Sequence, residues 1–312
     1  MASSIIGPIE KKDSADWGLR TIRLQHRLHE NPLFSDESLA ALIERTPQSV
    51  SPIVLMPGRD NPKGSWGYCD RSDLSGEAVL EAIKRGRLWI NMLKLEEVDS
   101  RFRDLLDTIF EEFGNAIPGF SPFRKTIGVL ISSPGTQVSY HADVPGQSLW
   151  QIRGQKRIYL YPPREPFLKA ANLENIIRGV TEEEIPYDAT YDEYAEICDL
   201  EPGDMMHWVL NGPHRVENAD CLNVSVTTEH WTPTTRRSFA MNYGNGVLRR
   251  EFGWTPKSHK ITGPAFWAKV GVTAAWRAMG LQQKTAFQRV ITNRVDPNAP
   301  DGVVPLPTSP AE

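Results

Sequence analysis

The chain has 312 residues, of which 40% are hydrophobic, and a formal net charge of −4. This size allows one substantial core with additions or two small domains, and the negative charge argues against a general nucleic-acid binder. The three cysteines are too few and too widely spaced for a disulfide framework or a CxxC zinc site, so a reducing cytoplasm is expected. No secretory signal or apolar run of about 20 residues is evident, which predicts a soluble protein without a transmembrane segment.

Three helices are predicted in the N-terminal part of the chain. The first starts after Ser35, a suitable N-cap residue followed by apolar residues at helical spacing. The second is expected over residues 75–85, and the third over residues 102–113, where aromatic and aliphatic side chains recur on one face. We therefore expect a flexible start over residues 1–15 and a mixed, mainly helical region over residues 16–120 that packs on a core further along the chain.

From about Thr126 the sequence changes to short β-rich runs separated by Gly and Pro. Eight runs are predicted as strands: TIGVLISS, TQVSYHAD, SLWQI, KRIYLYPP, EICDL, DMMHWVL, HRVEN and LNVSVTTEHW. Eight short strands within about a hundred residues are typical of a β-sandwich or barrel. Residues 164–196 interrupt the pattern with a helix-like, strongly acidic stretch, which we interpret as a long insertion over the mouth of the barrel.

The C-terminal part is basic. Between Arg236 and Arg294 there are eleven Lys and Arg residues and one acid, Glu251, which leaves ten net positive charges in this segment. Residues 233–294 are therefore predicted to form a basic helical module. The last eighteen residues, 295–312, contain five prolines and are predicted to form an unstructured tail.

The first chemical signal is the pair His141 and Asp143. Residues two apart on a strand point to the same face, so the imidazole and the carboxylate are expected to converge on one metal. His214 is the candidate third ligand, because two histidines and one carboxylate on one face of an iron leave three positions open. Two of these can take a 2-oxo acid and one can take dioxygen. A zinc hydrolase uses the same donor types, so the triad alone does not decide the chemistry.

These segments resemble the JmjC and cupin-like oxygenases, especially the asparaginyl-hydroxylase branch and bacterial cupin-like proteins. SPGTQVSYHAD, QSLWQIRGQKRIYLYPP, LEPGDMMHWVLNGPHRVEN and LNVSVTTEHW resemble the family's HxD strand, its Q-I-x-G-x-K-R strand, its distal-histidine segment and its closing strand. The resemblance implies a mainly β fold with flanking helices, whose catalytic core is a double-stranded β-helix (jelly roll) over residues 121–232. It also implies an Fe(II)-dependent dioxygenase that uses 2-oxoglutarate and O2 to hydroxylate a substrate C–H bond, releasing succinate and CO2.

In that family a lysine binds the distal carboxylate of 2-oxoglutarate, and the matching residue is Lys156. Alternation along its strand places Lys156 on the same face as Ile158 and Leu160, where a buried charge needs an anionic partner. Further contacts to the co-substrate are predicted for five polar residues: Gln147, Ser225, Thr227, Thr126 and Ser139. His207 is interpreted as a packed histidine rather than a ligand.

Two other classes of protein stay open. One is a non-catalytic cupin-like binding or regulatory protein, and the other is a metal-only cupin enzyme or hydrolase, which would not need Lys156. The motifs do not name a substrate, because substrates are recognised by loops that vary within a fold. The basic C-terminal helices are predicted to form a homodimer contact, as in related oxygenases, with an anionic substrate or a membrane surface as the alternative. A nucleic-acid partner is not expected.

Overall fold

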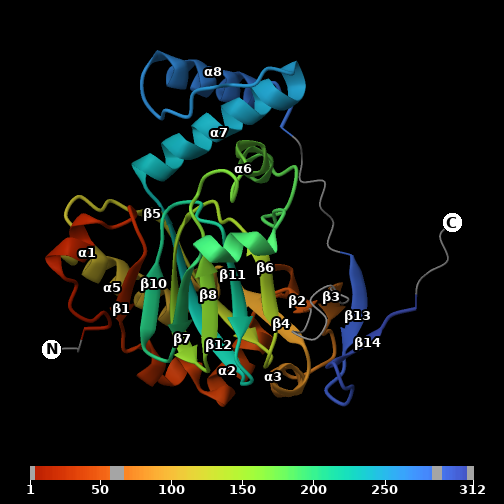
Figure 1. Ribbon diagram of the computed structural model, residues 1–312. Helices are drawn as coiled ribbons and strands as arrows, with labels where there is room; N and C mark the ends of the chain where they lie inside the picture. Colours follow the sequence, from red (N-terminus) through yellow and green to blue (C-terminus); the bar gives the residue numbers. More distant parts are fainter. Residues whose placement is uncertain (1–3, 57–66, 283–289, 308–312) are drawn as a thin grey trace.

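Two β-sheets form the core of the protein in the computed structural model, which describes residues 4–56, 67–282 and 290–307. The eight predicted strands are confirmed as β5 (Phe123–Ser132), β6 (Gln137–His141), β7 (Gly146–Arg153), β8 (Lys156–Leu160), β9 (Glu196–Leu200), β10 (Asp204–His207), β11 (His214–Asn218) and β12 (Asn223–Trp231). They divide equally, with the order β10-β7-β12-β5 in one sheet and β6-β11-β8-β9 in the other. The sheets face each other as a jelly roll (Figure 1), as predicted.

The first of these sheets continues well beyond the jelly roll. Its additional strands are β1 (Ile22–Gln25), β2 (Ile53–Leu55), β3 (Gly67–Asp70), β4 (Leu88–Met92), β13 (Ile291–Val295) and β14 (Val303–Pro305). The full order is β1-β10-β7-β12-β5-β4-β2-β3-β13-β14. The N-terminal region therefore extends the sheet as well as packing on it.

Both chain ends differ from the sequence-based prediction. The N–H groups of Ile5 and Ile6 donate to the Glu112 carboxylate at 2.9 and 2.8 Å, so these residues of the segment predicted to be flexible are anchored to the domain. Residues 1–3 of that segment lie outside the described residues. At the other end, β14 lies within the segment predicted to be an unstructured tail, and its partner β13 pairs in parallel with β3. Residues 308–312 of that tail lie outside the described residues.

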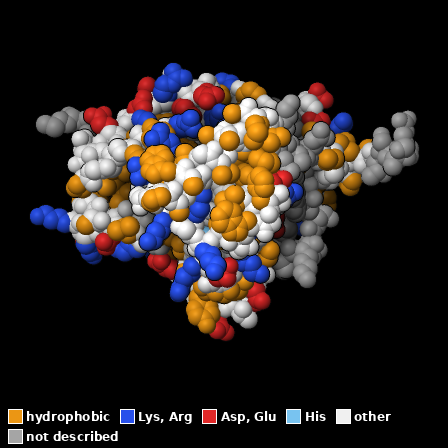
Figure 2. Space-filling model, turned by 90° about the horizontal axis from the view of Figure 1, so that it is seen from above, with side chains coloured by type: hydrophobic (Ala, Val, Ile, Leu, Met, Phe, Trp, Pro, Cys, Tyr) orange, Lys and Arg blue, Asp and Glu red, His pale blue; other side chains and the backbone are white. Residues whose placement is uncertain are grey.

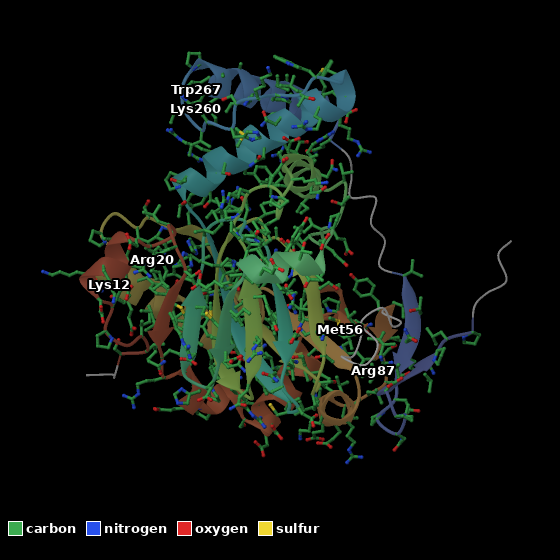
Figure 3. All side chains as sticks on the ribbon, in the orientation of Figure 1. Lys12, Arg20, Met56, Arg87, Lys260 and Trp267 are labelled. Carbon is green, nitrogen blue, oxygen red and sulfur yellow. The ribbon has the colours of Figure 1, made fainter. Side chains whose placement is uncertain are left out.

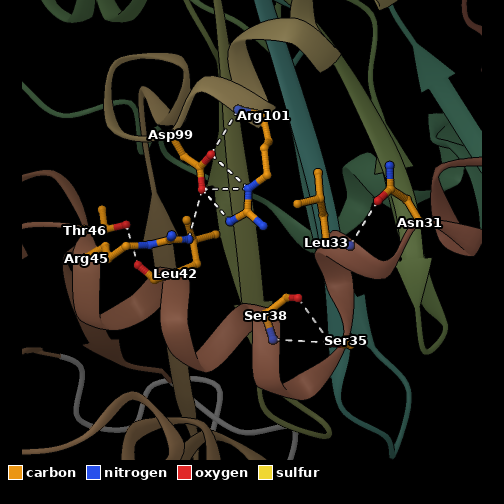
Figure 4. Close-up of polar contacts among 9 residues, drawn as sticks. All are labelled: Asn31, Leu33, Ser35, Ser38, Leu42, Arg45, Thr46, Asp99 and Arg101. Carbon is orange, nitrogen blue, oxygen red and sulfur yellow. Dashed lines mark hydrogen bonds and ion pairs between the residues drawn. The ribbon is translucent and has the colours of Figure 1, made fainter.

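The helices are α1 (Lys11–Ala15), α2 (Asp36–Arg45), α3 (Gly76–Arg85), α4 (Leu95–Val98), α5 (Ser100–Ala116), α6 (Ala170–Ile177), α7 (Pro233–Phe252) and α8 (Pro264–Ala278). The three predicted N-terminal helices are confirmed as α2, α3 and α5. At the start of α2, Ser35 Oγ accepts a hydrogen bond from the N–H of Ser38, as an N-cap does (Figure 4). The Asp99 carboxylate before α5 pairs with Arg45 and Arg101, which joins α2 to α5 (Figure 4).

The main hydrophobic core lies between the larger sheet and α2, α3 and α5. The apolar face of α5 contributes the buried residues Phe102 and Phe113. The ring centroid of Phe113 lies 5.8 Å from that of Trp150 on β7, which is fully buried. A smaller apolar cluster lies inside the jelly roll, where Ile158, Trp208 and their neighbours line the space between the sheets. This arrangement leaves the inner faces of β6, β8, β11 and β12 available to build a site.

The acidic insertion and the basic helices lie together at one end of the jelly roll (Figure 1). Arg249 of α7 pairs with Glu174 of α6 at 2.6 Å, and Arg178 pairs with Glu251 at 2.5 Å. The prediction of a basic helical module is confirmed for α7 and α8, whereas residues 291–295 form a strand and residues 283–289 lie outside the described residues. Within the described part of the chain, no helix has the length and apolar character needed to cross a membrane.

Candidate metal and co-substrate site

The predicted metal ligands meet where β6 ends and β11 begins. His141 is the last residue of β6 and is paired with His214, the first residue of β11. Asp143 follows two residues after His141, just beyond the end of the strand, and still converges on the same point. Its carboxylate lies 3.7 Å from His141 Nε2 and 3.3 Å from His214 Nε2. One donor atom from each of the three residues lies within 4.8 Å of the others, as a shared metal ion requires.

Backbone carbonyls orient both imidazole rings. His141 Nδ1 lies 2.8 Å from the carbonyl oxygen of Ser139, and His214 Nδ1 lies 3.0 Å from that of Gly212. A carbonyl only accepts, so each Nδ1 carries the proton and each Nε2 presents its lone pair to the shared point. The side chain of Asn211 donates to the carbonyl oxygen of Asp143 at 2.6 Å and holds the segment that carries the carboxylate.

The surroundings of the three residues fit a divalent cation. Asp143 is buried, and its Oδ2 has no hydrogen-bond donor among the described residues, which is costly for an ionised oxygen. Burial, together with the nearby His141, lowers the pKa of His214 to about 4, so this imidazole is neutral at pH 7 and able to bind a metal. Two neutral nitrogens and one carboxylate oxygen suit Fe(II) with open positions, and a metal at this point would satisfy the orphaned oxygen.

A cavity of about 510 Å³ contains these ligands and Lys156. Lys156 is the first residue of β8, which follows the tight turn through Gly154, where the backbone has a positive φ of 74°. A Cβ at Gly154 would collide with the carbonyl oxygen of Leu222, so the glycine in the Q-I-x-G-x-K-R pattern has a steric reason. The Lys156 side chain is buried, and its ammonium group has no hydrogen bond or ion pair among the described residues. Burial lowers its pKa to about 8.

Three of the five polar residues predicted to assist Lys156 line this cavity: Gln147, Thr227 and Ser139. Gln147 Oε1 is buried without a donor among the described residues, so it is available to a ligand. The other two, Ser225 and Thr126, do not line the cavity. The hydroxyl of Ser225 donates to the side chain of Gln151 at 2.7 Å. Ser225 was predicted because it shares a strand face with Thr227, but a shared face does not give the depth along the strand. Thr126 was predicted only as a further hydroxyl.

His207 packs elsewhere, as predicted. Its ring stacks on Trp17 with the ring centroids 4.2 Å apart, and its Nδ1 lies 2.8 Å from the carbonyl oxygen of Gln147. Burial lowers the pKa of His207 to about 3, so the ring is neutral. It does not line the cavity that contains His141 and His214.

Sequence reasoning missed several residues of the cavity wall: Trp89, Asn91, Glu182, Glu183, Glu184, Asn218 and Glu229. Asn218 and Glu229 were accessible to the alternation argument, because they share a strand face with His214 and Thr227 respectively. Trp89 and Asn91 come from β4, and nothing in the sequence links that strand to β5. Desolvation and the nearby Asp143 raise the pKa of Glu229 to about 7. Glu183 is exposed overall, yet desolvation of its carboxyl and the nearby Asp143 also raise its pKa to about 7.

Fold and site together define a double-stranded β-helix protein in which a His-Asp-His triad able to hold a metal ion shares a cavity with a buried lysine. No protein-family model matches the sequence, and no curated protein matches it. Among solved structures, the fold is similar to that of Escherichia coli ycfD, with a TM-score of 0.51 and 15% identity over 90% of this chain and 70% of that chain. This similarity concerns the fold alone, and it agrees with the jelly roll predicted from the sequence.

Two further structures of the same bacterial protein match less closely. One is described as YcfD, a ribosomal oxygenase from E. coli, in complex with cobalt and 2-oxoglutarate. It gives a TM-score of 0.46 with 18% identity over 88% of this chain and 66% of that chain. The other contains cobalt and succinic acid and gives a TM-score of 0.45 with 16% identity over 88% and 68% of the respective chains.

Proposed function

We propose that this protein is an Fe(II)- and 2-oxoglutarate-dependent dioxygenase that hydroxylates a C–H bond of its substrate. The observation that carries the proposal is that a metal-type triad and a buried lysine without a partner among the described residues line one cavity. A metal alone would require only the triad. Lys156 requires an anion, and a dicarboxylate that also chelates the metal accounts for both features.

The residues of the chain have distinct tasks in this proposal. His141, Asp143 and His214 hold the metal, and Lys156 binds the distal carboxylate of 2-oxoglutarate, with Gln147 as a further polar contact. Ile158, Trp208 and Val216 form apolar wall around the same space and exclude water. When bound, iron and 2-oxoglutarate supply oxidative decarboxylation, in which one atom of O2 enters the substrate and the other enters succinate. Demethylation would follow from the same chemistry on an N-methyl carbon.

The two alternatives stay distinguishable. A non-catalytic binding or regulatory protein would release no succinate, and a metal-only cupin enzyme or hydrolase would turn over without 2-oxoglutarate. Lys156 is the observation that weighs against both alternatives, because neither gives a buried ammonium group a partner.

We expect the purified protein to release succinate from 2-oxoglutarate only when Fe(II) and O2 are both present. Slow decarboxylation without the natural substrate is enough for this measurement by chromatography or NMR. Reactions without iron, without oxygen, or with Lys156→Ala protein serve as controls. Succinate formation that continues after removal of the metal, or no binding of Fe(II) and 2-oxoglutarate at all, would contradict the proposal.

The proposal also covers the oligomeric state of the protein and its location in the cell. We propose a homodimer through the C-terminal helices, because large hydrophobic side chains gather over α7 and α8 among Lys and Arg (Figure 2). Trp254 and Trp267 are 63% and 61% exposed, and both Trp267 and the basic Lys260 lie at this end of the molecule (Figure 3). Burying such a surface against a second copy removes it from water.

A cytoplasmic location is supported by the free thiols of the three cysteines.

We expect the intact protein to sediment as a dimer and Trp267→Asp protein to sediment as a monomer, because a buried charge would oppose the contact. Leu19→Asp is the matched control, since Leu19 is 74% exposed and lies on the N-terminal side of the protein. Sedimentation velocity at several concentrations gives the oligomeric state. A strictly monomeric wild-type protein that co-sediments with anionic vesicles would replace the dimer with a membrane surface as the partner.

A further inference from the structure

A second cavity, of about 440 Å³, lies behind the larger sheet as seen from the proposed active site. Glu229 of β12 lines the first cavity and the next residue, His230, lines the second, because successive side chains of a strand point to opposite faces. The second cavity is enclosed by the segment before β1, the loop after α5, the ends of β10 and β12, and the first turn of α7. None of its described lining residues is Asp, Glu, Lys or Arg, and the proposed function gives this cavity no task.

His207 presents a hydrogen-bond acceptor to the second cavity. Its Nδ1 lies 2.8 Å from the carbonyl oxygen of Gln147, which can only accept, so Nδ1 carries the proton and Nε2 has the lone pair. Nε2 faces Gly18 of the cavity wall, where a Cβ would lie 3.9 Å from it. His207 is only 3% exposed, and Nε2 has no partner in the described part of the chain. Such a buried polar atom requires a proton donor.

His230 adds a hydrogen-bond donor beside it. Its ring centroid lies 5.9 Å from that of His207, and the residue is 4% exposed. Neither ring nitrogen has a hydrogen-bond partner among the residues that the structure describes. Burial lowers the pKa of His230 to about 4, so the ring is neutral and one of its nitrogens carries a proton. Gly146, which is paired with His230, leaves room for this ring, because a Cβ there would lie 2.9 Å from Nε2.

The first turn of α7 supplies a positive potential and a further donor. The N-cap residue Thr232 accepts a hydrogen bond from the N–H of Thr235 at 3.1 Å. Pro233 has no N–H, and the N–H of Thr234 has no acceptor among the described residues. Residues 232–235 all line the cavity, so the positive end of the helix dipole faces it. Helix N-termini with free N–H groups bind phosphate and other oxyanions.

These groups together select the chemistry of a ligand. The helix N-terminus and the two N–H donors favour an anion, whereas Nε2 of His207 requires that the anion also carries a proton. A carboxylate or a sulfate has no such proton near neutral pH. A phosphate monoester has a second pKa of about 6, so its monoanion carries one P–OH group beside its acceptor oxygens. Ile117, Phe120 and Leu210 line the remaining space, which is larger than a phosphate group and suits an organic body.

We propose that the second cavity binds a small organic phosphate monoester. The P–OH group donates to Nε2 of His207, and the other phosphate oxygens accept from the His230 ring and from the N–H of Thr234. The organic part of the ligand packs on Ile117 and Phe120. Neither the metal nor 2-oxoglutarate takes part in this binding, so the inference stands separately from the proposed function.

Matched probes test the proposal on the full-length protein. Calorimetric titrations at pH 6 compare phenyl phosphate, of which about half is the monoanion, with phenyl sulfate, a monoanion of similar shape without a proton, and with neutral benzamide. We expect phenyl phosphate to bind at least about tenfold more tightly than either, because a site that recognises a hydroxyl rejects an analogue without it. Inorganic phosphate should bind more weakly than phenyl phosphate, and equal affinity would contradict the organic part of the proposal.

Variants assign the binding to the second cavity. His230→Phe removes a donor without the loss of an internal hydrogen bond and should weaken phenyl phosphate binding about tenfold. His207→Phe should abolish the preference for phosphate over sulfate. His259→Phe, at an exposed histidine outside the cavity, should change neither property, and Lys156→Ala should also have no effect, since Lys156 lines the other cavity.

Thermal unfolding shows whether each variant is folded, and the ratio of phosphate to sulfate affinity in the wild type depends on no variant. Equal affinities for phenyl phosphate and phenyl sulfate, no binding of phenyl phosphate, or loss of its binding in Lys156→Ala would each overturn the proposal. A preference for phosphate that survives in His207→Phe would do the same.

Discussion

Replacement of His141, Asp143 or His214 by Ala is expected to abolish iron-dependent succinate release while leaving the fold intact. Each variant removes one of three donor atoms that lie within 4.8 Å of one another. Loss of a group that only orients a metal ligand already costs about 10- to 100-fold in metal affinity, so loss of a ligand should cost more. Metal content per chain and succinate release, measured on the same samples, check the result.

Thermal unfolding gives this prediction a readout that does not depend on turnover. A metal that binds only the folded protein stabilises it by about 2.7 kcal/mol at a hundredfold excess over its dissociation constant. The wild type should therefore melt at a higher temperature when Fe(II) or Zn²⁺ is added, and the three variants should not. Asp143→Ala should not destabilise the metal-free protein, because Asp143 Oδ2 has no hydrogen-bond donor there. His207→Ala is the control and should retain metal and measurable activity; a ligand set that includes His207 in place of His214 would reverse these outcomes.

The jelly roll could be predicted because each of its strands carries a local signal. Apolar and β-branched residues recur along β5 to β12, and Gly or Pro lies between most consecutive strands. The extensions of the larger sheet had no such signal. β1 pairs with β10, so Arg23 lies opposite Met206 although β5 to β9 all lie between them in sequence. Likewise β13 joins β3 from the far end of the chain. Pairing between short strands so distant in sequence depends on tertiary packing, which local periodicity does not contain.

The same distinction, between local sequence signals and tertiary pairing, applies to the residues of the candidate site. His141, Asp143, His214 and Lys156 could be found because their spacing matches a recognisable motif, and the fold brings all four to one cavity. Glu183 could not, since its place depends on how a long insertion pairs with the edge of β6. The insertion was predicted to lie over the barrel mouth, but no rule based on the sequence predicts which of its acids would enter the cavity.

Replacement of Lys156 by Ala is expected to weaken 2-oxoglutarate binding about ten- to a hundredfold without loss of the metal. A charge-assisted contact to a carboxylate contributes about 1.5–3 kcal/mol, and each 1.4 kcal/mol is tenfold in affinity. Lys125→Ala is the matched control, because Lys125 lies on β5, pairs with Asp107 at 2.8 Å and does not line the cavity. Calorimetric titration of 2-oxoglutarate into protein loaded with Zn²⁺ measures the affinity. Unchanged affinity in Lys156→Ala would remove this residue from the co-substrate site.

The pH dependence of the same titration follows from the burial of Lys156, which lowers its pKa to about 8. Only the protonated ammonium attracts the dicarboxylate, so the binding-competent form is present below this pKa and is lost as the pH rises through it. The affinity of the wild type should therefore be nearly constant up to about pH 7.5 and should fall by up to about tenfold per pH unit above pH 8. In Lys156→Ala this dependence should vanish, and an identical slope in both proteins would assign the titrating group to another residue.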